Sequence, residues 1–423
     1  MTFGFQQVSE FAVISSCRSC GSDELTPVID LGKVPLADGL VASLAEVDHE
    51  SFYPLTVVFC GRCSLVQIRE TVPPHELYGS DYPYYSSFSD HLVDHSRSNV
   101  EDLLDRYNLD EQSLVVELAS NDGYLLQWFT KHGVPVLGID PAEGPAQTAI
   151  ERGIPTICEF FGPDLADRLV DEGRMADVVI GNNVLAHVPD QNVFVDAIAR
   201  LLSPTGVVVM EFPYVRDLVE HCEFDTIYHE HHCYFSVTSV RELFARNGLK
   251  LVRVEHLEIH GGSLRVHFRR QGAPEESVVG YLEEERRLGV THAGYYSDFA
   301  VRVAAIKQDL LQLLDDLLEK GARVAGYAAA AKGAIMLNYC GIGPERLEYV
   351  VDRNVHKHGK YMPGVHIPIE DPKRLLEDVP DYLLLLAWNF KDEIVAQQAA
   401  YAAAGGRFIV PVPEPAVLAE RDT

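Results

Sequence analysis

Short apolar runs alternate with amphipathic stretches along the chain from about residue 100 onward. The apolar runs predict strands over residues 114–118, 134–139, 177–180 and 207–210, with helical stretches between them. Strands that alternate with helices build a parallel sheet with helices on both faces. The central part of the chain is therefore expected to be a doubly wound α/β domain.

A second unit of the same kind begins with a long amphipathic helix, predicted over residues 299–319. Gly321 is expected to end this helix, and further strands are predicted near residues 347–351, 382–387 and 407–410. The helix is predicted because its apolar residues recur at intervals of three or four. These residues are Phe299, Val303, Ile306, Leu310, Leu313 and Leu317.

The patterns divide the chain into three predicted parts. Residues 1–75 form a cysteine-containing module, and residues 76–298 form the central α/β domain. Residues 299–423 form a smaller Rossmann-like α/β domain. Within the central domain, a histidine-rich segment interrupts the strand–helix alternation around residues 216–270.

The 423 residues include 35 lysines and arginines against 63 aspartates and glutamates, which is a formal net charge of −28. Charge repulsion disfavours nucleic acids and anionic membrane surfaces as partners. No apolar run approaches the length of about 18 residues that a membrane span needs, and the first residues lack the features of a secretory signal. The default expectation is a soluble cytoplasmic protein.

Two C-x2-C pairs stand out among the eight cysteines: Cys17 with Cys20, and Cys60 with Cys63. Each pair can place two thiolates at a turn, and two pairs complete the tetrahedral coordination of Zn²⁺. Redox dithiols or disulfides are the alternative, which a cytoplasmic location disfavours. Because four cysteines leave no open position, the zinc is expected to be structural. Gly21 and Gly61 are expected to supply the positive φ angles of the two turns.

Polar residues lie at or just after the carboxyl ends of three predicted parallel strands. They are Glu117 with the loop 119–123, Asp140, and the pair Asn182 and Asn183. Ligands of open parallel sheets bind at the carboxyl ends of the strands, and an acidic residue after the second strand can accept both ribose hydroxyls of a nucleoside. The sequence therefore predicts a nucleoside cofactor at this edge.

Two cofactors suit this layout. A nicotinamide dinucleotide needs a G-x-G-x-x-G loop for its pyrophosphate, whereas this loop is A-S-N-D-G, with Asn121, Asp122 and Gly123. The carboxylate of Asp122 would repel phosphate but suits the cationic sulfonium and ammonium groups of S-adenosylmethionine. The charges favour S-adenosylmethionine, and a doubly wound domain that binds neither cofactor remains the alternative.

The histidine-rich segment, residues 228–232, reads Tyr-His-Glu-His-His. The cluster can be interpreted as metal ligands, although adjacent residues rarely converge on one ion. It can also be an acid/base site, in which a histidine accepts a proton, a carboxylate orients it, and a tyrosine hydroxyl donates to a developing oxyanion. Solvated surface histidines are the third interpretation.

Basic residues gather in the carboxyl-terminal part. Lys332 lies in GYAAAAKG (326–333), where a predicted strand meets a helix whose amino terminus can bind a phosphate. Arg353 and Lys357 lie in VDRNVHKHGK (351–360), a positive island in an acidic chain. The alternative for this island is a solvated surface run.

The central motifs resemble those of class I methyltransferases. ELASNDG (117–123), GIDP (138–141), GNNVLAHV (181–188) and LLSPTG (201–206) occur in that family's order and spacing, with Ala119 where the family pattern has glycine. Together with CRSC, CGRC, YPYYSS, YHEHHCYFS, HGGSLR, GYAAAAKG and NYCGIG, they resemble the nucleotide-sugar C-methyltransferases over essentially the whole chain.

The resemblance implies transfer of a methyl group from S-adenosylmethionine to C3 of a TDP-4-keto-deoxysugar, for branched sugars of antibiotics or surface glycans. It implies that His231 is the general base and that Glu230 is its partner or an acid. Tyr228, His187 and a connector tyrosine (Tyr82, Tyr84 or Tyr85, with Tyr82 preferred) would surround the sugar. A non-catalytic binding module and an oxidoreductase are the rival functions. The sugar, the methylated carbon and the oligomeric state stay open.

Overall fold

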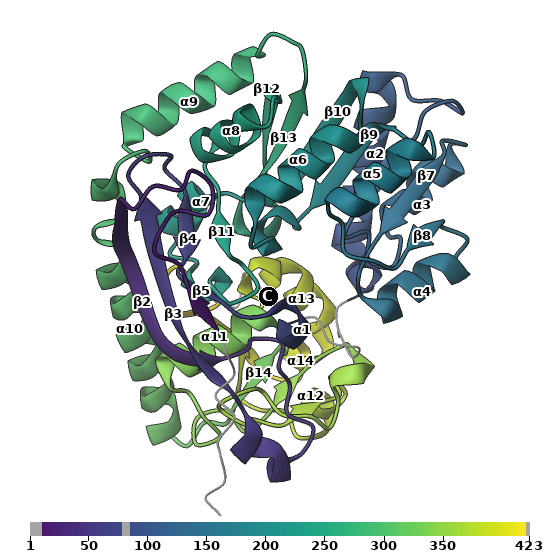
Figure 1. Ribbon diagram of the computed structural model, residues 1–423. Coiled ribbons are helices and arrows are strands. Elements are labelled where there is room, and N and C mark those ends of the chain that lie inside the picture. Colours follow the sequence, from purple (N-terminus) through teal and green to yellow (C-terminus); the bar gives the residue numbers. More distant parts are fainter. Residues whose placement is uncertain (1–10, 78–84, 420–423) are drawn as a thin grey trace, which may run out of the picture.

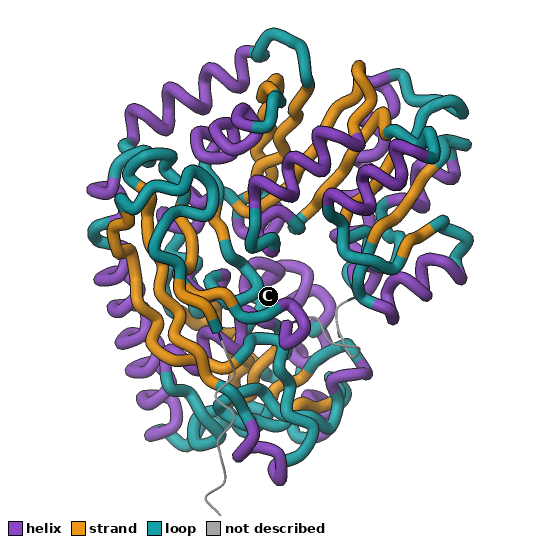
Figure 2. The backbone as a smooth tube through the Cα atoms, viewed as in Figure 1, coloured by secondary structure: helices purple, strands orange, loops and turns teal. Residues whose placement is uncertain are grey.

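The computed structural model describes residues 11–77 and 85–419, in which the strands form three large sheets and one small one (Figure 1). The large sheets lie in separate regions of the molecule, with helices packed around them (Figure 2). Within the described ranges, no helix combines the length and the apolar character needed to cross a bilayer. Tyr82 and Tyr84 lie outside the described residues.

The four-stranded sheet is antiparallel and has the order β11-β4-β3-β2. Three of its strands come from the cysteine module, and one comes from the histidine-rich region far along the chain. The sheet therefore joins the cysteine module to the centre of the sequence. Its strands are β2 (Leu25–Pro35), β3 (Phe52–Cys60), β4 (Val66–Ile68) and β11 (Cys233–Tyr234), and the short strands β1 (Ala12–Val13) and β5 (Glu70–Thr71) pair beside it.

The seven-stranded sheet has the order β12-β13-β10-β9-β6-β7-β8. Five adjacent strands are parallel, which confirms the doubly wound prediction, and an antiparallel pair at one edge was not predicted. The strands are β6 (Val115–Leu118), β7 (Val136–Ile139), β8 (Thr156–Ile157), β9 (Ala176–Asn182), β10 (Leu202–Pro213), β12 (Lys250–Leu257) and β13 (Ser263–Arg269). The helices of this region are α2 (Asp90–Tyr107), α3 (Leu126–Lys131), α4 (Glu143–Glu151), α5 (Pro163–Asp171), α6 (Gln191–Leu201), α7 (Val215–Glu220), α8 (Val237–Arg246) and α9 (Glu276–Leu288).

The point where this sheet changes direction decides where a ligand can bind. The chain runs from β6 outward to β7 and β8, and then returns to the other side of β6 with β9. In open α/β sheets, ligands bind at the carboxyl ends of the strands beside such a switch point. The ends of β6, β7 and β9 therefore form the candidate cofactor edge.

The six-stranded sheet has the order β16-β15-β14-β17-β18-β19, with only its last strand antiparallel. The predicted strands near 347–351, 382–387 and 407–410 are confirmed. The strands are β14 (Val324–Tyr327), β15 (Val350–Val351), β16 (Ile369–Glu370), β17 (Tyr382–Leu385), β18 (Arg407–Val410) and β19 (Ala416–Val417). The remaining helices are α1 (Pro74–Leu77), α10 (Phe299–Glu319), α11 (Ala331–Cys340), α12 (Arg374–Glu377), α13 (Lys391–Gln397) and α14 (Ala399–Ala403).

Helix α10 confirms the prediction over residues 299–319, and Gly321 follows its end with a left-handed φ of 79°. The helix contacts β2 of the four-stranded sheet and α11 of the carboxyl-terminal domain, and all three contribute to one apolar core. Leu314 is fully buried in that core, whereas the predicted Leu313 is only partly buried. The predicted apolar stripe is therefore correct except at this position.

We expect Val303→Ala to lower the free energy of unfolding by about 2 kcal/mol, because it removes two methyl groups from this core and leaves a cavity. Val303 is 0% exposed, whereas Val301 on the same helix is 70% exposed. Val301→Ala is the matched control, expected to be neutral or slightly stabilising, since alanine is the better helix former. Urea unfolding followed by circular dichroism measures both variants. Equal effects would contradict the burial of this helix face.

Candidate active site

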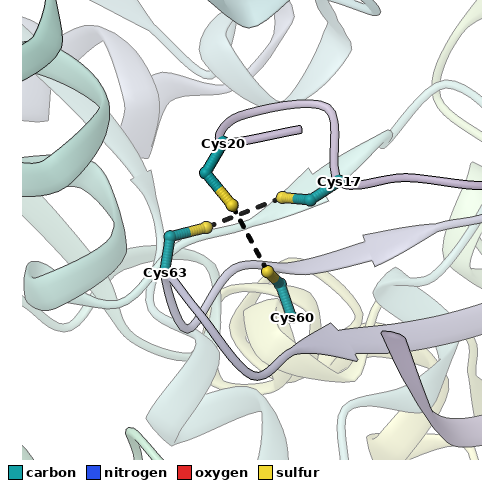
Figure 3. A group of neighbouring side chains, drawn as sticks. All are labelled: Cys17, Cys20, Cys60 and Cys63. Carbon is teal, nitrogen blue, oxygen red and sulfur yellow. Dashed lines mark hydrogen bonds between the residues drawn. The ribbon is translucent and has the colours of Figure 1, made fainter. Parts of the chain in front are cut away.

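The four predicted zinc ligands converge at one end of the four-stranded sheet (Figure 3). The Sγ atoms of Cys17 and Cys63 are 3.6 Å apart, those of Cys20 and Cys60 are 3.5 Å apart, and all four lie within 4.8 Å of one another. Tetrahedral Zn–S bonds of about 2.3 Å place sulfurs about 3.8 Å apart. The spacing fits a bound zinc ion and is far too long for a disulfide.

Each C-x2-C pair forms a turn of the same geometry. The amide of Gly21 donates to the Cys17 carbonyl over 2.9 Å, and the amide of Ser64 donates to the Cys60 carbonyl over 3.0 Å. Gly21 and Ser64 have the positive φ angles, 71° and 62°. The expectation for Gly61 was therefore wrong: the left-handed residue follows the second cysteine of each pair, and in the second turn it is a serine.

The first turn is attached to the central domain. The side-chain amide of Asn192 in α6 donates to the carbonyls of Arg18 and Ser19, over 3.1 and 2.9 Å. The Arg18 guanidinium donates to the Glu70 carbonyl over 2.9 Å and to the Thr71 hydroxyl over 2.7 Å. The zinc turn thus holds the edge of its own module against the central domain.

Asp140, at the end of β7, organises the candidate cofactor edge. Its carboxylate accepts hydrogen bonds from the amides of Asn121 and Ala142, both over 2.8 Å. Burial raises the pKa of Asp140. Burial, followed by the charges of Asp140 and Asp122, raises the pKa of Glu117 well above its ordinary value. The structure therefore brings together the carboxyl groups predicted for cofactor binding.

The connector before α2 rests against the same loop. The side-chain oxygen of Asn121 accepts from the Ser86 amide over 2.8 Å, and the Ser87 hydroxyl donates to Asp122. Arg152 pairs with the same Asp122 oxygen over 3.1 Å. Asn121 and Asp122 therefore use some of their hydrogen bonds to hold the segment before α2 in place, a role that the sequence did not predict.

His231 lies in a chain of hydrogen bonds that determines its tautomer. Its Nδ1 is 3.0 Å from the Thr226 carbonyl, and its Nε2 is 2.9 Å from the Tyr228 hydroxyl. Because a carbonyl can only accept, Nδ1 carries the proton, and Nε2 accepts from Tyr228. Burial, followed by the charge of His187, lowers the pKa of His231 well below its ordinary value. The imidazole is therefore neutral with its basic nitrogen facing a tyrosine.

His187 completes this group from the short helix η3 (Leu185–His187), which follows β9. The His187 and His231 rings are 4.7 Å apart and nearly perpendicular. Burial lowers the pKa of His187 to about 4. The structure thus brings together Tyr228, His231 and His187, as the sequence predicted.

Glu230 does not orient His231, because the Thr226 carbonyl takes that place. The expectation that a carboxylate orients the histidine was therefore wrong, because a backbone carbonyl does so. Glu230 is buried beside Asp38, and one of its oxygens has no partner among the described residues. Burial, and then the charge of Asp38, raise the pKa of Glu230 to about 8.

The two flanking histidines have other surroundings. His229 Nε2 lies 3.0 Å from the Pro54 carbonyl, and burial lowers its pKa to about 4. His232 contributes backbone hydrogen bonds to Ala186 and Ile68. Neither joins the group formed by Tyr228 and His231, so of the three histidines only His231 has the surroundings of a base.

Three family models match successive parts of the chain: a zinc binding domain over residues 17–78, a methyltransferase domain over 92–254, and a C-methyltransferase C-terminal domain over 258–413. The C-methyltransferase NovU of Streptomyces niveus is 37% identical over 413 residues, which span 97% of this chain and 98% of that protein. The chain belongs to this C-methyltransferase family. The family resemblance noted from the sequence is confirmed.

Shorter likenesses cover the central region. The ubiquinone biosynthesis O-methyltransferase of Bartonella tribocorum is 26% identical over 95 residues, 22% of this chain and 38% of that protein. Among solved structures, magnesium protoporphyrin IX methyltransferase from Synechocystis PCC 6803 with bound SAH is 20% identical and has a TM-score of 0.34, covering 42% of this chain and 83% of that chain.

The C-methyltransferase uses S-adenosylmethionine, and the cofactor edge suits this group. Four buried acceptor oxygens at the edge have no partner among the described residues. The hydroxyl and ammonium donors of the cofactor would satisfy them, and its cationic sulfonium would offset the clustered carboxylates. A diphosphate would add negative charge beside them. The four oxygens are Oε2 of Glu117, Oδ1 of Asp122, Oδ1 of Asn182 and Oδ1 of Asn183.

The predicted phosphate loop before α11 differs from expectation. The amide of Ala329 donates to the carboxylate of Asp352 over 2.8 Å, and the Ala329 carbonyl accepts from Lys357 over 2.7 Å. A carboxylate thus occupies part of the loop that was expected to meet a phosphate. Arg353 is half exposed and 3.8 Å from Glu393, while Lys332 lies 4.8 Å from the ring centre of Trp388.

Several residues near the candidate site were missed from the sequence. Asp38 reaches Glu230 from the zinc-binding module, His260 lies 3.4 Å from Asn183, and Trp388 donates to Asp225 over 2.7 Å. Only the motif HGGSLR drew attention to the surroundings of His260. The others are brought to the site from distant parts of the chain, and nothing in their local sequence marks them.

We expect Cys60→Ser to lower the zinc content from one ion per chain to nearly none, because zinc needs all four thiolates to complete its coordination. The variant should also melt at a lower temperature, since structural zinc contributes directly to folding. Cys158→Ser is the control, because Cys158 is exposed and outside the cluster. Elemental analysis and thermal melting measure both variants. Full zinc content in Cys60→Ser would contradict the four-cysteine site.

Proposed function

We propose that this C-methyltransferase methylates C3, the carbon next to the ketone, of a TDP-4-keto-deoxysugar. Such a reaction makes branched sugars of antibiotics or surface glycans, and we propose that it takes place in the cytoplasm. The observation that carries the proposal is the hydrogen-bond chain from Thr226 through His231 to Tyr228. A carbon next to a ketone loses a proton only to a positioned base, and this chain holds a neutral imidazole nitrogen against a tyrosine hydroxyl.

His231 is the proposed base, and the tyrosine hydroxyl lies at its basic nitrogen. As the C3–H bond breaks, the phenol oxygen of Tyr228 takes that proton and passes its own proton to Nε2 of His231. The proton ends on the imidazole, and the negative charge is left on the enolate of the sugar. The Thr226 carbonyl supports the resulting imidazolium, because it accepts from Nδ1 throughout.

Other residues are proposed to hold the reactants. When bound, S-adenosylmethionine supplies an electrophilic methyl group on a cationic sulfur. Glu117, Asn121, Asp122, Gly123, Asp140, Asn182 and Asn183 are the proposed cofactor residues. His187 and a connector tyrosine such as Tyr82 are proposed to contact the sugar, and the basic residues Lys332, Arg353 and Lys357 to contact the anionic substrate.

Incubation with S-adenosylmethionine and a panel of TDP-4-keto sugars is expected to add the mass of one CH₂ unit to at least one of them. His231→Ala should lower the rate by about 10²–10⁴-fold, the usual contribution of a general base. His292→Ala, at an exposed histidine, is the control and should keep the wild-type rate. Mass spectrometry follows the product. Full activity and full exchange of the C3 proton in His231→Ala would refute the proposed base.

Glu230 is proposed to act in its protonated form, as an acid. Since burial raises its pKa to about 8, the carboxyl is neutral below that pH and ionised above it. We therefore expect kcat/KM to fall as the pH rises through about 8. Glu230→Gln keeps a neutral group of the same shape, so its profile should be flat over that range. The same decline in Glu230→Gln would assign the basic limb to another group.

A further inference from the structure

Lys332 projects from the beginning of α11, directly after the loop that follows β14. Helix α11 packs against the short helix η4 (Phe224–Thr226), which leads into the histidine-rich segment. Lys332 therefore comes from the carboxyl-terminal domain but reaches the part of the chain that holds His231. Its positive charge is one of the causes that lower the pKa of His231 and of His260.

The ammonium group of Lys332 is buried, and no hydrogen bond or ion pair reaches it within the described ranges. It lies 4.8 Å from the centre of the Trp388 ring. The indole nitrogen of Trp388 donates to Oδ2 of Asp225 over 2.7 Å. Asp225 is 0% exposed, and its Oδ1 also has no hydrogen-bond partner among residues 11–77 and 85–419. A buried ammonium without an oxygen partner is costly, so this arrangement is that of a site completed by a ligand oxygen.

Two ligand oxygens are chemically reasonable: a phosphate oxygen of the nucleotide, or the ketone oxygen of the sugar. The loop before α11 argues against the phosphate, because Asp352 already occupies the Ala329 amide and brings a negative charge to the loop. Asp225 places a second carboxylate near Lys332. Helix α11 packs against the element that leads into the His231 segment, and the Lys332 charge acts on His231, which favours the oxygen next to the reacting carbon.

We propose that Lys332 is a catalytic residue whose ammonium donates a hydrogen bond to the ketone oxygen and stabilises the enolate. This inference rests on the proposed function. Lys332 transfers no proton: the C3–H bond breaks toward Tyr228 and His231, and the electron pair moves onto the ketone oxygen beside the ammonium. A preorganised charge in a buried site stabilises such an oxyanion strongly. Asp225 is a positioning residue, since it holds the ring of Trp388 on which the ammonium lies.

The test separates enolate formation from nucleotide binding. Exchange of the C3 proton is measured in D₂O without S-adenosylmethionine, on the TDP-4-keto sugar that the wild-type enzyme methylates. Affinity for TDP alone is measured by calorimetry. Lys332→Met should lower the exchange rate at saturating sugar by about 10²-fold or more, the effect of losing one oxyanion donor, and should leave the TDP affinity unchanged. Lys332→Arg, which keeps the charge, should recover part of the exchange.

Lys373→Met is the matched control, because the Lys373 side chain is 84% exposed. Unchanged binding of S-adenosylmethionine by Lys332→Met shows that the variant is folded. If Lys332→Met is not folded, Lys332→Arg and Lys332→Gln are compared instead, and the charged arginine variant should exchange the C3 proton faster. Equal exchange rates of these two variants would overturn the proposal.

Two outcomes would overturn the role of Lys332 directly. The first is exchange by Lys332→Met at the wild-type rate. The second is a loss of TDP affinity with unchanged exchange at saturation, which would make Lys332 a phosphate ligand. A wild-type enzyme that neither methylates nor exchanges any sugar of the panel would instead refute the proposed function, whatever Lys332 does.

Discussion

The geometry of the candidate active site depends on one residue that is hydrogen-bonded on both sides. The His232 amide donates to the Ala186 carbonyl over 2.7 Å, and the His232 carbonyl accepts from the Ile68 amide over 3.0 Å. The first bond ties the histidine-rich segment to the helix that carries His187, and the second ties it to the zinc-binding module. Because His231 precedes this residue directly, both bonds place its ring against His187.

The zinc site acts on the same geometry from a distance. The second cysteine pair begins at the last residue of β3, β4 follows that pair, and β11 adds to β4 with Cys233 opposite Gln67. The Gln67 side chain in turn donates to the Cys17 sulfur over 3.3 Å and accepts from the Arg18 amide over 2.9 Å. A metal that holds these strands also holds the strand that follows the histidines. In this way a structural ion can support chemistry in which it takes no part.

The site has two halves, the cofactor edge and the surroundings of His231, and burial makes their electrostatic environments opposite. At the cofactor edge, burial raises the pKa values of Glu117 and Asp140, and several acceptor oxygens have no partner among the residues that the structure describes, an environment suited to a cation. Around His231, burial keeps imidazoles neutral, and Lys332 brings an ammonium group with no hydrogen-bond partner in the described part of the chain, an environment suited to an enolate. The net charge of −28 describes neither half, since the chemistry depends on the few groups that folding removes from water.

The sequence alone determined whatever depends on local pattern. Apolar alternation predicted the parallel strands, three- and four-residue spacing predicted α10, and the doubled C-x2-C spacing predicted the metal cluster, because each signal lies within a few residues. The motifs also marked Glu117, Asp140 and His231 as candidates.

Tertiary structure decided what depends on residues far apart in the chain. It paired β11 with the zinc-binding module and brought His229 to the Pro54 carbonyl. It also brought the Thr226 carbonyl, and not the Glu230 carboxyl group, to Nδ1 of His231. It also set Lys332 against Trp388 and Asp225. The sequence does not distinguish the three histidines of residues 228–232 from one another. Only the groups packed around them determine that His231 is the neutral, oriented base.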